Sequence, residues 1–407
     1  MAALHPFHAL RPTPERAAAV AAVPYDVVNT NEARELADGN PLSFLHISRA
    51  EIDLPPATDP YADAVYAAAA RNFQRLREAA PLVFDEAPGL YLYKLRMGRH
   101  EQTGVAGCFS VDEYERDIIR KHERTRKDKE DDRTRHIVDL RAQTGPVFLT
   151  YPTSLAVDAV AARVADGPPV FDFTAPDGVQ HTVWHVPESE GTALVVAFAA
   201  IPLLYIADGH HRAASAMRAR QVLRDQASGE SPAEANTFLG VAFPSDQAQI
   251  LPYHRVVKDL AEHSPASLLE ALRGRMDVRA GNDTPDGPGE VAMYLAGKWH
   301  ALTLATPSPG AAPADRLDVA RLHEQVLAPL LQVGDVRVDK RIDFVGGIRG
   351  PGALARLVDE GRAAVAFAMH PVSIGDLMAI ADAGGIMPPK STWFEPKLRD
   401  GLLSHVI

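Results

Sequence analysis

The densest group of chemically versatile side chains lies at residues 208–212, where the sequence reads DGHHR. The apolar run before it predicts a strand through 203–206, and the apolar spacing after it predicts a helix that begins near Gly209. Unpaired amides at a helix N-terminus carry partial positive charge and suit a phosphate group. Gly209 would let a ligand approach the backbone closely, and Arg212 could add bidentate hydrogen bonds to phosphoryl oxygens.

The other three side chains of this motif favour proton transfer or metal binding. Asp208 could orient a hydroxyl, bind a metal ion or cap the helix. His210 and His211 could donate protons or stabilise transferring charge near neutral pH. The motif lacks the Gly-Lys-Ser/Thr ending of a Walker A loop, and adjacent histidines without a cysteine set do not fit a zinc site. A capped helix with structural histidines is the alternative, and the combination of residues favours a functional site.

Four further segments allow both a structural and a functional interpretation. The segment KHERTRKDKEDDR (121–133) could be a solvated helix face, with pairs such as Glu123/Lys127 spaced i,i+4. PYDV (24–27) could be a simple turn. YHR (253–255) could supply a second cation, and PPKST (388–392) could be either a docking loop or a lid that contacts substrate.

The periodicity predicts a mixed α/β fold class around these segments. An amphipathic helix is predicted at 61–79 and much of the charged stretch 112–144 is predicted to be helical, while 43–51 reads as a strand. Hairpins are predicted to turn near Gly98 and at Asp177–Gly178. The strand and helix patterns alternate along the whole chain, which predicts mixed sheets covered by helices.

The amino-acid composition indicates which kinds of molecule the protein binds. The 407 residues carry a formal net charge of −11, which argues against a broad nucleic-acid or anionic-membrane surface and favours a small-molecule partner. The single cysteine, Cys108, excludes an intrachain disulfide and reads as a buried residue. We see neither a signal peptide nor an apolar run long enough for a membrane span, so a cytoplasmic location is expected. Nothing in the sequence indicates an oligomeric state.

The length suggests two or three domains, and the Pro/Gly-rich stretch 306–315 is the best linker by composition. We therefore predict an N-terminal α/β part at 1–145, a core at 146–305 that carries DGHHR, and a C-terminal α/β part at 316–407.

The motif DGHHR resembles the phosphate-binding motif of the ParB/sulfiredoxin superfamily, in particular its free-serine kinase branch. The whole chain also resembles a large bacterial and archaeal family catalogued as ten-fifteen among the domains of unknown function. The matching segments are RP (11–12), VPYDVV (23–28), HERT (122–125), DDR (131–133), ADGHHRAA (207–214), LPYHRVV (251–257) and MPPKSTWFEPKL (387–398).

The motif resemblance implies a ParB/sulfiredoxin-like nucleotide-binding core with an additional subdomain. It implies a nucleotide-dependent kinase that phosphorylates the hydroxyl of a small metabolite, serine or serine-like, with ATP or ADP as donor and Mg²⁺ as cofactor. A phosphatase or nucleotide hydrolase that uses the same pocket is an alternative. A ParB-like regulatory module is another, although no helix-turn-helix signal or extended basic domain accompanies it.

The resemblance also assigns roles to individual residues. Glu123 becomes the candidate general base. Independently of the resemblance, His122, Glu123, Asp208 and His211 are expected to share one cleft, because neither segment alone offers both phosphate binding and a base. The full candidate set comprises catalytic Glu123, Asp208, His210 and His211; phosphate-binding Gly209, Arg212, Lys127 and Arg133; substrate-binding His122, Thr125, Lys390, Ser391 and Thr392; and Asp208 as metal ligand.

Overall fold

A computed structural model describes residues 2–80, 82–227 and 232–407, and the chain divides into two units. The first unit comprises Met1–Ala248 together with Pro396–Ile407, and the second comprises Gln249–Glu395. These limits differ from the predicted divisions at 145 and 305. Strands on either side of 145 pair within one sheet of the first unit, and strands on either side of 306–315 pair within one sheet of the second.

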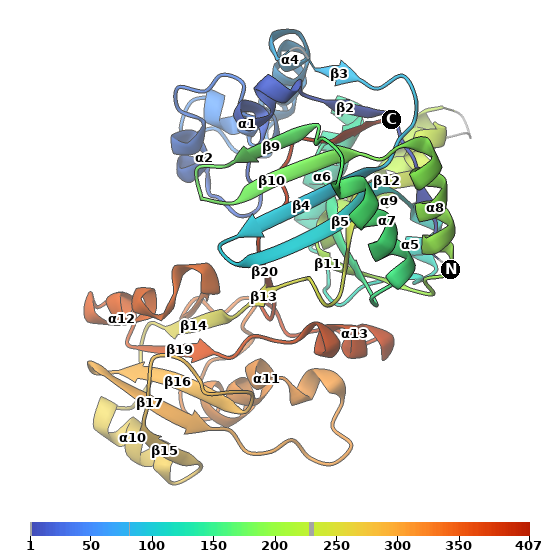
Figure 1. Ribbon diagram of the computed structural model, residues 1–407. Helices are drawn as coiled ribbons and strands as arrows, with labels where there is room; N and C mark the ends of the chain where they lie inside the picture. The colour runs from blue at the N-terminus through green and yellow to red at the C-terminus, as the bar shows by residue number, and fades with distance from the viewer. Residues whose placement is uncertain (1, 81, 228–231) are drawn as a thin grey trace. The chain divides into compact units, whose positions relative to one another are not determined.

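A mixed nine-stranded sheet forms the centre of the first unit, which confirms the α/β fold class (Figure 1). Its order is β6-β11-β8-β12-β5-β4-β10-β9, and β1 also pairs with β5; β12·β8 and β11·β6 are parallel pairs. Both predicted hairpins are confirmed, as β4/β5 and β9/β10. The strands are β1 (Leu4–His5), β4 (Tyr91–Met97), β5 (His100–Ser110), β6 (Ile119–Arg120), β8 (Val147–Tyr151), β9 (Phe171–Thr174), β10 (Gln180–His185), β11 (Leu204–Asp208) and β12 (Thr237–Pro244).

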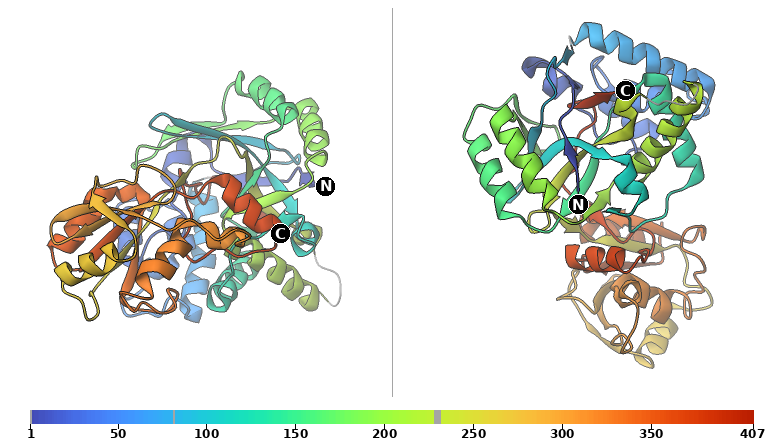
Figure 2. Two further views of the ribbon diagram at one scale, coloured as in Figure 1. Left: turned by 90° about the horizontal axis from the view of Figure 1, so that it is seen from below. Right: turned by 90° about the vertical axis from the view of Figure 1, so that its right-hand side faces the viewer.

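Helices of the first unit bury their apolar faces against this sheet and against one another. Helices α7 and α8 lie side by side (Figure 2), and Val160 and Phe198 from them join a core with the sheet residues Phe109 and Leu149. Burial of such side chains is the main favourable term in folding. The helices are α1 (Ala17–Val20), α2 (Thr30–Ala37), α3 (Leu45–Ser48), α4 (Asp63–Ala79), α5 (Val111–Glu115), α6 (Lys127–Leu140), α7 (Leu155–Ala165), α8 (Glu188–Ala199) and α9 (His210–Gln226).

A four-stranded sheet brings the end of the chain to the N-terminal part of the same unit. Strand β21 (Ser404–Val406) lies between β2 (Ala9–Arg11) and β7 (Ala142–Gln143), and β3 (Val83–Phe84) pairs with the far side of β2. This pairing fixes the position of Pro396–Ile407, the segment that carries Lys397 and Asp400.

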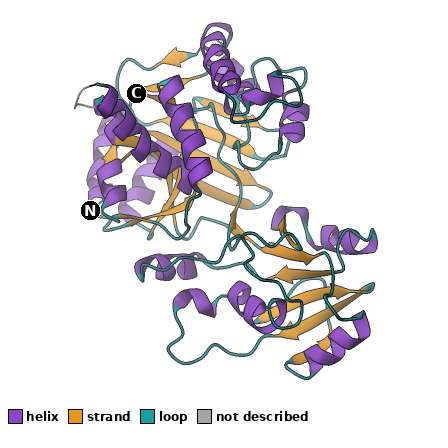
Figure 3. Ribbon diagram, turned by 180° about the vertical axis from the view of Figure 1, so that it is seen from behind, coloured by secondary structure: helices purple, strands orange, loops and turns teal. Residues whose placement is uncertain are grey.

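The second unit is built on a six-stranded antiparallel sheet of order β15-β17-β16-β19-β14-β18 (Figure 3). A separate pair joins β13 to β20. Its elements are β13 (Ile250–Leu251), β14 (Tyr253–Val257), α10 (Pro265–Arg273), β15 (Asp277–Ala280), β16 (Glu290–Leu295), β17 (Lys298–Thr303), α11 (Asp318–Leu322), β18 (Ile342–Gly346), α12 (Pro351–Asp359), β19 (Val365–Met369), α13 (Ile374–Asp382) and β20 (Trp393–Phe394).

One predicted element is wrong, and the predicted helical stretch 112–144 is helical in α5 and α6 but interrupted between them. The expected strand at 43–51 is helix α3 followed by a 3₁₀ turn, because Leu45 and Ile47 are both buried in a compact core with α4. The stretch 112–144 breaks after α5, because the fully buried Ile119 forms strand β6 beside β11. The HERT segment therefore lies in a loop, and the helix resumes only at Lys127.

None of the helices in the described ranges is long and apolar enough to cross a lipid bilayer.

Candidate functional site

The junction predicted at DGHHR is confirmed: β11 ends at Asp208 and α9 begins at His210. Gly209 lies between them with φ +93°, and its carbonyl accepts hydrogen bonds from the amides of Arg212 (2.9 Å) and Ala213 (3.1 Å). No side chain of the described residues caps this helix. The first amides of α9 are thus the groups at which a helix presents partial positive charge to an anion.

From the backbone conformation of Gly209 we predict how a substitution at this position changes the free energy of unfolding. A Cβ at this position would meet only ordinary contacts at 3.5 Å, so the cost of Gly209→Ala comes from its positive φ, about 1–2 kcal/mol. Gly191 in α8 is the matched control, because nothing lies within 4 Å of its added Cβ; alanine there should stabilise the protein by about 0.5–1 kcal/mol. Denaturant unfolding of both variants measures the difference. Equal effects would contradict the argument from backbone strain.

The loop that holds HERT contacts the start of α9 through two histidines. The rings of His122 and His210 lie edge to face with centroids 4.4 Å apart, and the His122 amide donates to His210 Nε2 at 3.4 Å. In the neutral ring this leaves the proton on His210 Nδ1, which lies 3.9 Å from Glu123 Oε2. The next histidine, His211, accepts from the amide of Arg126 at 3.0 Å through Nε2.

His122 is the least satisfied polar side chain of this group. It is 1% exposed, and neither ring nitrogen has a hydrogen-bond partner among the described residues. A buried polar atom without a partner costs free energy, so its retention points to a ligand or an ordered water at this position.

All three histidines at the site are held neutral at pH 7. Burial lowers the pKa of His122 to about 4, although the nearby charge of Asp208 opposes the shift. Burial, together with His122, lowers the pKa of His210 well below its usual value, and burial also lowers the pKa of His211. These rings therefore act as neutral hydrogen-bonding groups, and the positive charge at the site must come from other residues.

Lys397 supplies a positive charge that the sequence did not single out. Its Nζ lies 2.8 Å from Asp208 Oδ2, across 189 residues of chain. Burial alone would raise the pKa of Asp208, but Lys397 and Arg212 outweigh it and hold the pKa below the usual value. Asp208 is thus a carboxylate at neutral pH, as a ligand for a divalent cation must be.

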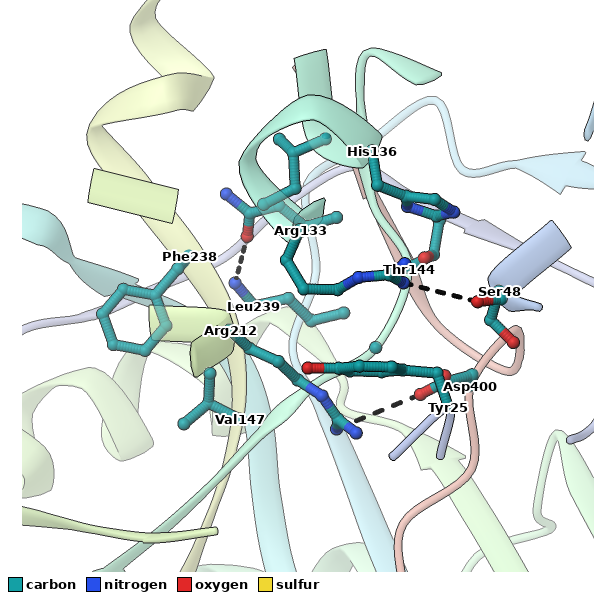
Figure 4. Close-up of a pocket in the computed structure, with 13 residues that line it drawn as sticks. Tyr25, Ser48, Arg133, His136, Thr144, Val147, Arg212, Phe238, Leu239 and Asp400 are labelled. Carbon is teal, nitrogen blue, oxygen red and sulfur yellow. Dashed lines mark hydrogen bonds and ion pairs between the residues drawn. The ribbon is translucent and has the colours of Figure 1, made fainter. Parts of the chain in front are cut away.

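The two predicted phosphate-binding arginines point into a small cavity of about 40 Å³ (Figure 4). Arg212 donates to the Pro146 carbonyl at 2.8 Å and lies 3.4 Å from Asp26 and 4.0 Å from Asp400. Arg133 is paired with the neighbouring Asp132 at 2.9 Å. A cavity of this size holds a few waters and no nucleotide. Phosphate contacts by these arginines therefore stay predictions.

The remaining predicted residues are divided between the units. Thr125 donates to Glu130, and the Lys127 ammonium pairs with Asp131 at 2.8 Å while the side chain stays 85% exposed. Lys390, Ser391 and Thr392 belong to the second unit. The structure places His122 and Glu123 against His210, whereas the His211 ring accepts from the amide of Arg126. A common cleft of His122, Glu123, Asp208 and His211 stays a prediction.

The buried histidines make the free energy of unfolding depend on pH. The pKa is lowered by burial to about 4 in His122 and His254 and to about 3 in His136. Below pH 6.5 these histidines become protonated in the unfolded chain but stay neutral in the folded protein. The free energy of unfolding therefore decreases as the pH falls, by at most about 1.4 kcal/mol per ring and pH unit. Asp400 acts in the opposite sense, since burial raises its pKa to about 6.

Urea unfolding between pH 7 and pH 4.5 checks this expectation. The wild type should lose several kcal/mol, and His136→Gln should flatten the slope. A free energy that stays constant over this interval would contradict the neutral, buried state of the histidines.

Comparisons with known proteins give weak structural likenesses. A free serine kinase in complex with AMP is 12% identical with a TM-score of 0.33, and the match covers 74% of this chain and 92% of that one. A conserved hypothetical protein from Pyrococcus furiosus is 13% identical with a TM-score of 0.33, covering 74% and 95%. C-terminally truncated SbnI from Staphylococcus aureus is 14% identical with a TM-score of 0.39, covering 74% and 87%. No curated protein matches the chain.

A protein-family model also matches most of the chain. The family described as "Protein of unknown function (DUF1015)" matches residues 4–320, about three quarters of the sequence. The chain therefore belongs to the DUF1015 family.

Proposed function

We propose that this protein is a nucleotide-dependent kinase that transfers a phosphoryl group to the hydroxyl of a small metabolite, serine or serine-like, with ATP or ADP as donor. The observation that carries the proposal is the open start of α9 with the Glu123 carboxylate and the two neutral histidines gathered at it. Phosphoryl transfer needs positioned charge and a base more than covalent chemistry, and this set supplies both. The resemblance of DGHHR to the free-serine kinase motif supports the same assignment.

On the donor side, the first amides of α9 bind the phosphate oxygens and Lys397 offsets their charge. Asp208 is suited to bind Mg²⁺ because its carboxylate stays ionised. A Mg²⁺ ion held there would neutralise charge on the donor phosphates. Because His210 and His211 are neutral near pH 7, they do not protonate the phosphate oxygens of the donor.

On the acceptor side, Glu123 takes the proton of the attacking hydroxyl. Its side chain is 48% exposed, which leaves room for a ligand, and the proton on His210 Nδ1 faces its carboxylate. As the acceptor oxygen forms its bond to phosphorus, the bond from phosphorus to the bridging oxygen of the nucleotide breaks, and the electron pair leaves with the nucleotide. The unpaired ring nitrogens of His122 are suited to hold the acceptor.

Incubation of the purified protein with ATP or ADP, Mg²⁺ and a panel of hydroxyl metabolites tests the proposal. Mass spectrometry should detect the phosphate ester of at least one hydroxyl compound. Release of inorganic phosphate alone would make the protein a hydrolase. Nucleotide binding without turnover would favour the regulatory-module alternative.

A further inference from the structure

Arg255 is a buried cation in the second unit, and no carboxylate of the described residues pairs with it. It is 3% exposed on β14, which lies between β19 and β18 in the six-stranded sheet. Its guanidinium donates to the carbonyls of Tyr253 and Lys390, the latter at 3.0 Å, and lies 5.5 Å from the centre of the Phe344 ring. Across the described parts of the chain, no carboxylate forms an ion pair with it.

The other buried arginines of the described residues show how unusual this is. Arg321, 8% exposed, pairs with Asp318 at 2.6 Å, and Arg399, 4% exposed, pairs with Asp177. A charge removed from water and left without a counter-ion is among the most costly features a folded protein can retain. Burial lowers the pKa of Arg255 to about 9, so the group is still charged at neutral pH.

The loop that covers Arg255 is held in an unfavourable conformation. Lys390 has φ +57°, in the left-handed region that costs a side-chain-bearing residue about 1–2 kcal/mol. The carbonyl of Lys390 accepts a hydrogen bond from the Arg255 guanidinium. Trp393 anchors the loop against the sheet at Gly346, where a Cβ would lie within 2.9 Å of the indole ring.

Lys390 carries a second cation, which lies near the same tyrosine that Arg255 contacts. The Lys390 ammonium is 5.5 Å from the centre of the Tyr253 ring, whose residue also provides one of the carbonyls bound by Arg255. Two cations with no paired carboxylate match a dianion better than a monoanion, and an arginine fork matches the geometry of phosphate oxygens. A phosphate group carries close to two negative charges at pH 7.

We propose that Arg255 and Lys390 form a phosphate-binding site in the second unit, in which a phosphate group replaces the Lys390 carbonyl on the guanidinium. The ligand is either inorganic phosphate or the phosphate monoester of a metabolite. The residues of this site all belong to the second unit, and its assignment does not depend on the proposed kinase activity.

Equilibrium dialysis of the full chain against labelled inorganic phosphate tests the site, at constant ionic strength set with chloride. We expect Arg255→Met to bind one phosphate fewer per chain than the wild type, and Lys390→Gln to weaken that phosphate by about tenfold, the usual effect of one charge-assisted contact. Competition by AMP would identify the ligand as a phosphate monoester, and no competition would identify it as free phosphate. Unchanged stoichiometry in folded Arg255→Met would overturn the proposal.

Unfolding in phosphate-free buffer separates this role from a merely structural one. Arg255→Met should be as stable as the wild type or more stable, because it removes an uncompensated buried charge. The matched control, Arg321→Met, should be less stable, because it leaves Asp318 without its partner. A loss of stability in Arg255→Met equal to that of the control would show that the arginine serves only to hold the loop, and would also overturn the proposal.

Discussion

Turnover by Glu123→Gln is expected to fall by about 10²-fold or more, while nucleotide affinity stays near the wild-type value. The substitution keeps the shape of the side chain and its hydrogen-bonding reach toward His210 but removes the basic carboxylate. A base that acts only on the acceptor hydroxyl contributes in the transition state and not in nucleotide binding, so kcat should change and the nucleotide Kd should not.

A matched control is available in the same segment. Asp128 is 46% exposed and pairs with Arg126, so Asp128→Asn removes a nearby carboxylate that has no part in the site. Near-normal turnover of Glu123→Gln would move the role of the base to Asp208. Loss of nucleotide binding in Glu123→Gln would instead place the carboxylate at the donor phosphates or their metal ion.

Arg212→Ala is expected to lower the free energy of unfolding by about 3–5 kcal/mol, the usual result of removing one partner from a buried ion pair. Burial disfavours the charged guanidinium, yet Asp400 and Asp26 outweigh it and raise the pKa of Arg212 above its usual value. Truncation leaves the Pro146 carbonyl without its donor and removes the positive charge that lies 4.0 Å from the Asp400 carboxyl. Urea unfolding measures the loss.

Arg220→Ala, on the same helix, is the control for this experiment. Its guanidinium pairs with the exposed carboxylates of Asp112 and Glu115, and such surface pairs contribute about 0–1 kcal/mol. If Arg212→Ala keeps its stability and loses nucleotide affinity by tens- to a hundredfold, the guanidinium contacts the phosphates and the structural role assigned to it is wrong.

Local signals in the sequence were sufficient to predict the start of the site. The change from strand to helix periodicity at Gly209 and the turn requirement of glycine are encoded within a few residues. The combination of HERT with DGHHR came from the functional argument that neither segment alone supplies both a phosphate site and a base. The structure places the His122 amide against His210, which lies in sequence between Asp208 and His211, the two DGHHR residues that are expected in the same cleft.

Contacts between distant segments could not be predicted in the same way. Lys397 reaches Asp208 because β21 returns the end of the chain to the first unit, and no periodicity in the sequence marks that pairing. Arg212 turns inward because Asp400 and Pro146 surround it, although its position in the motif favours a ligand contact. The segment 43–51 has an apolar pattern compatible with either a strand or a short helix, and the tertiary packing of Leu45 and Ile47 decides between them.

A crystal structure of the protein with bound ADP and Mg²⁺ tests the central claim most directly, because it locates the phosphates. The account predicts that the terminal phosphate lies within hydrogen-bond distance of the amides of His210 and His211, with Glu123 on the side from which a hydroxyl would attack. Phosphates bound elsewhere, with the start of α9 empty, would contradict it.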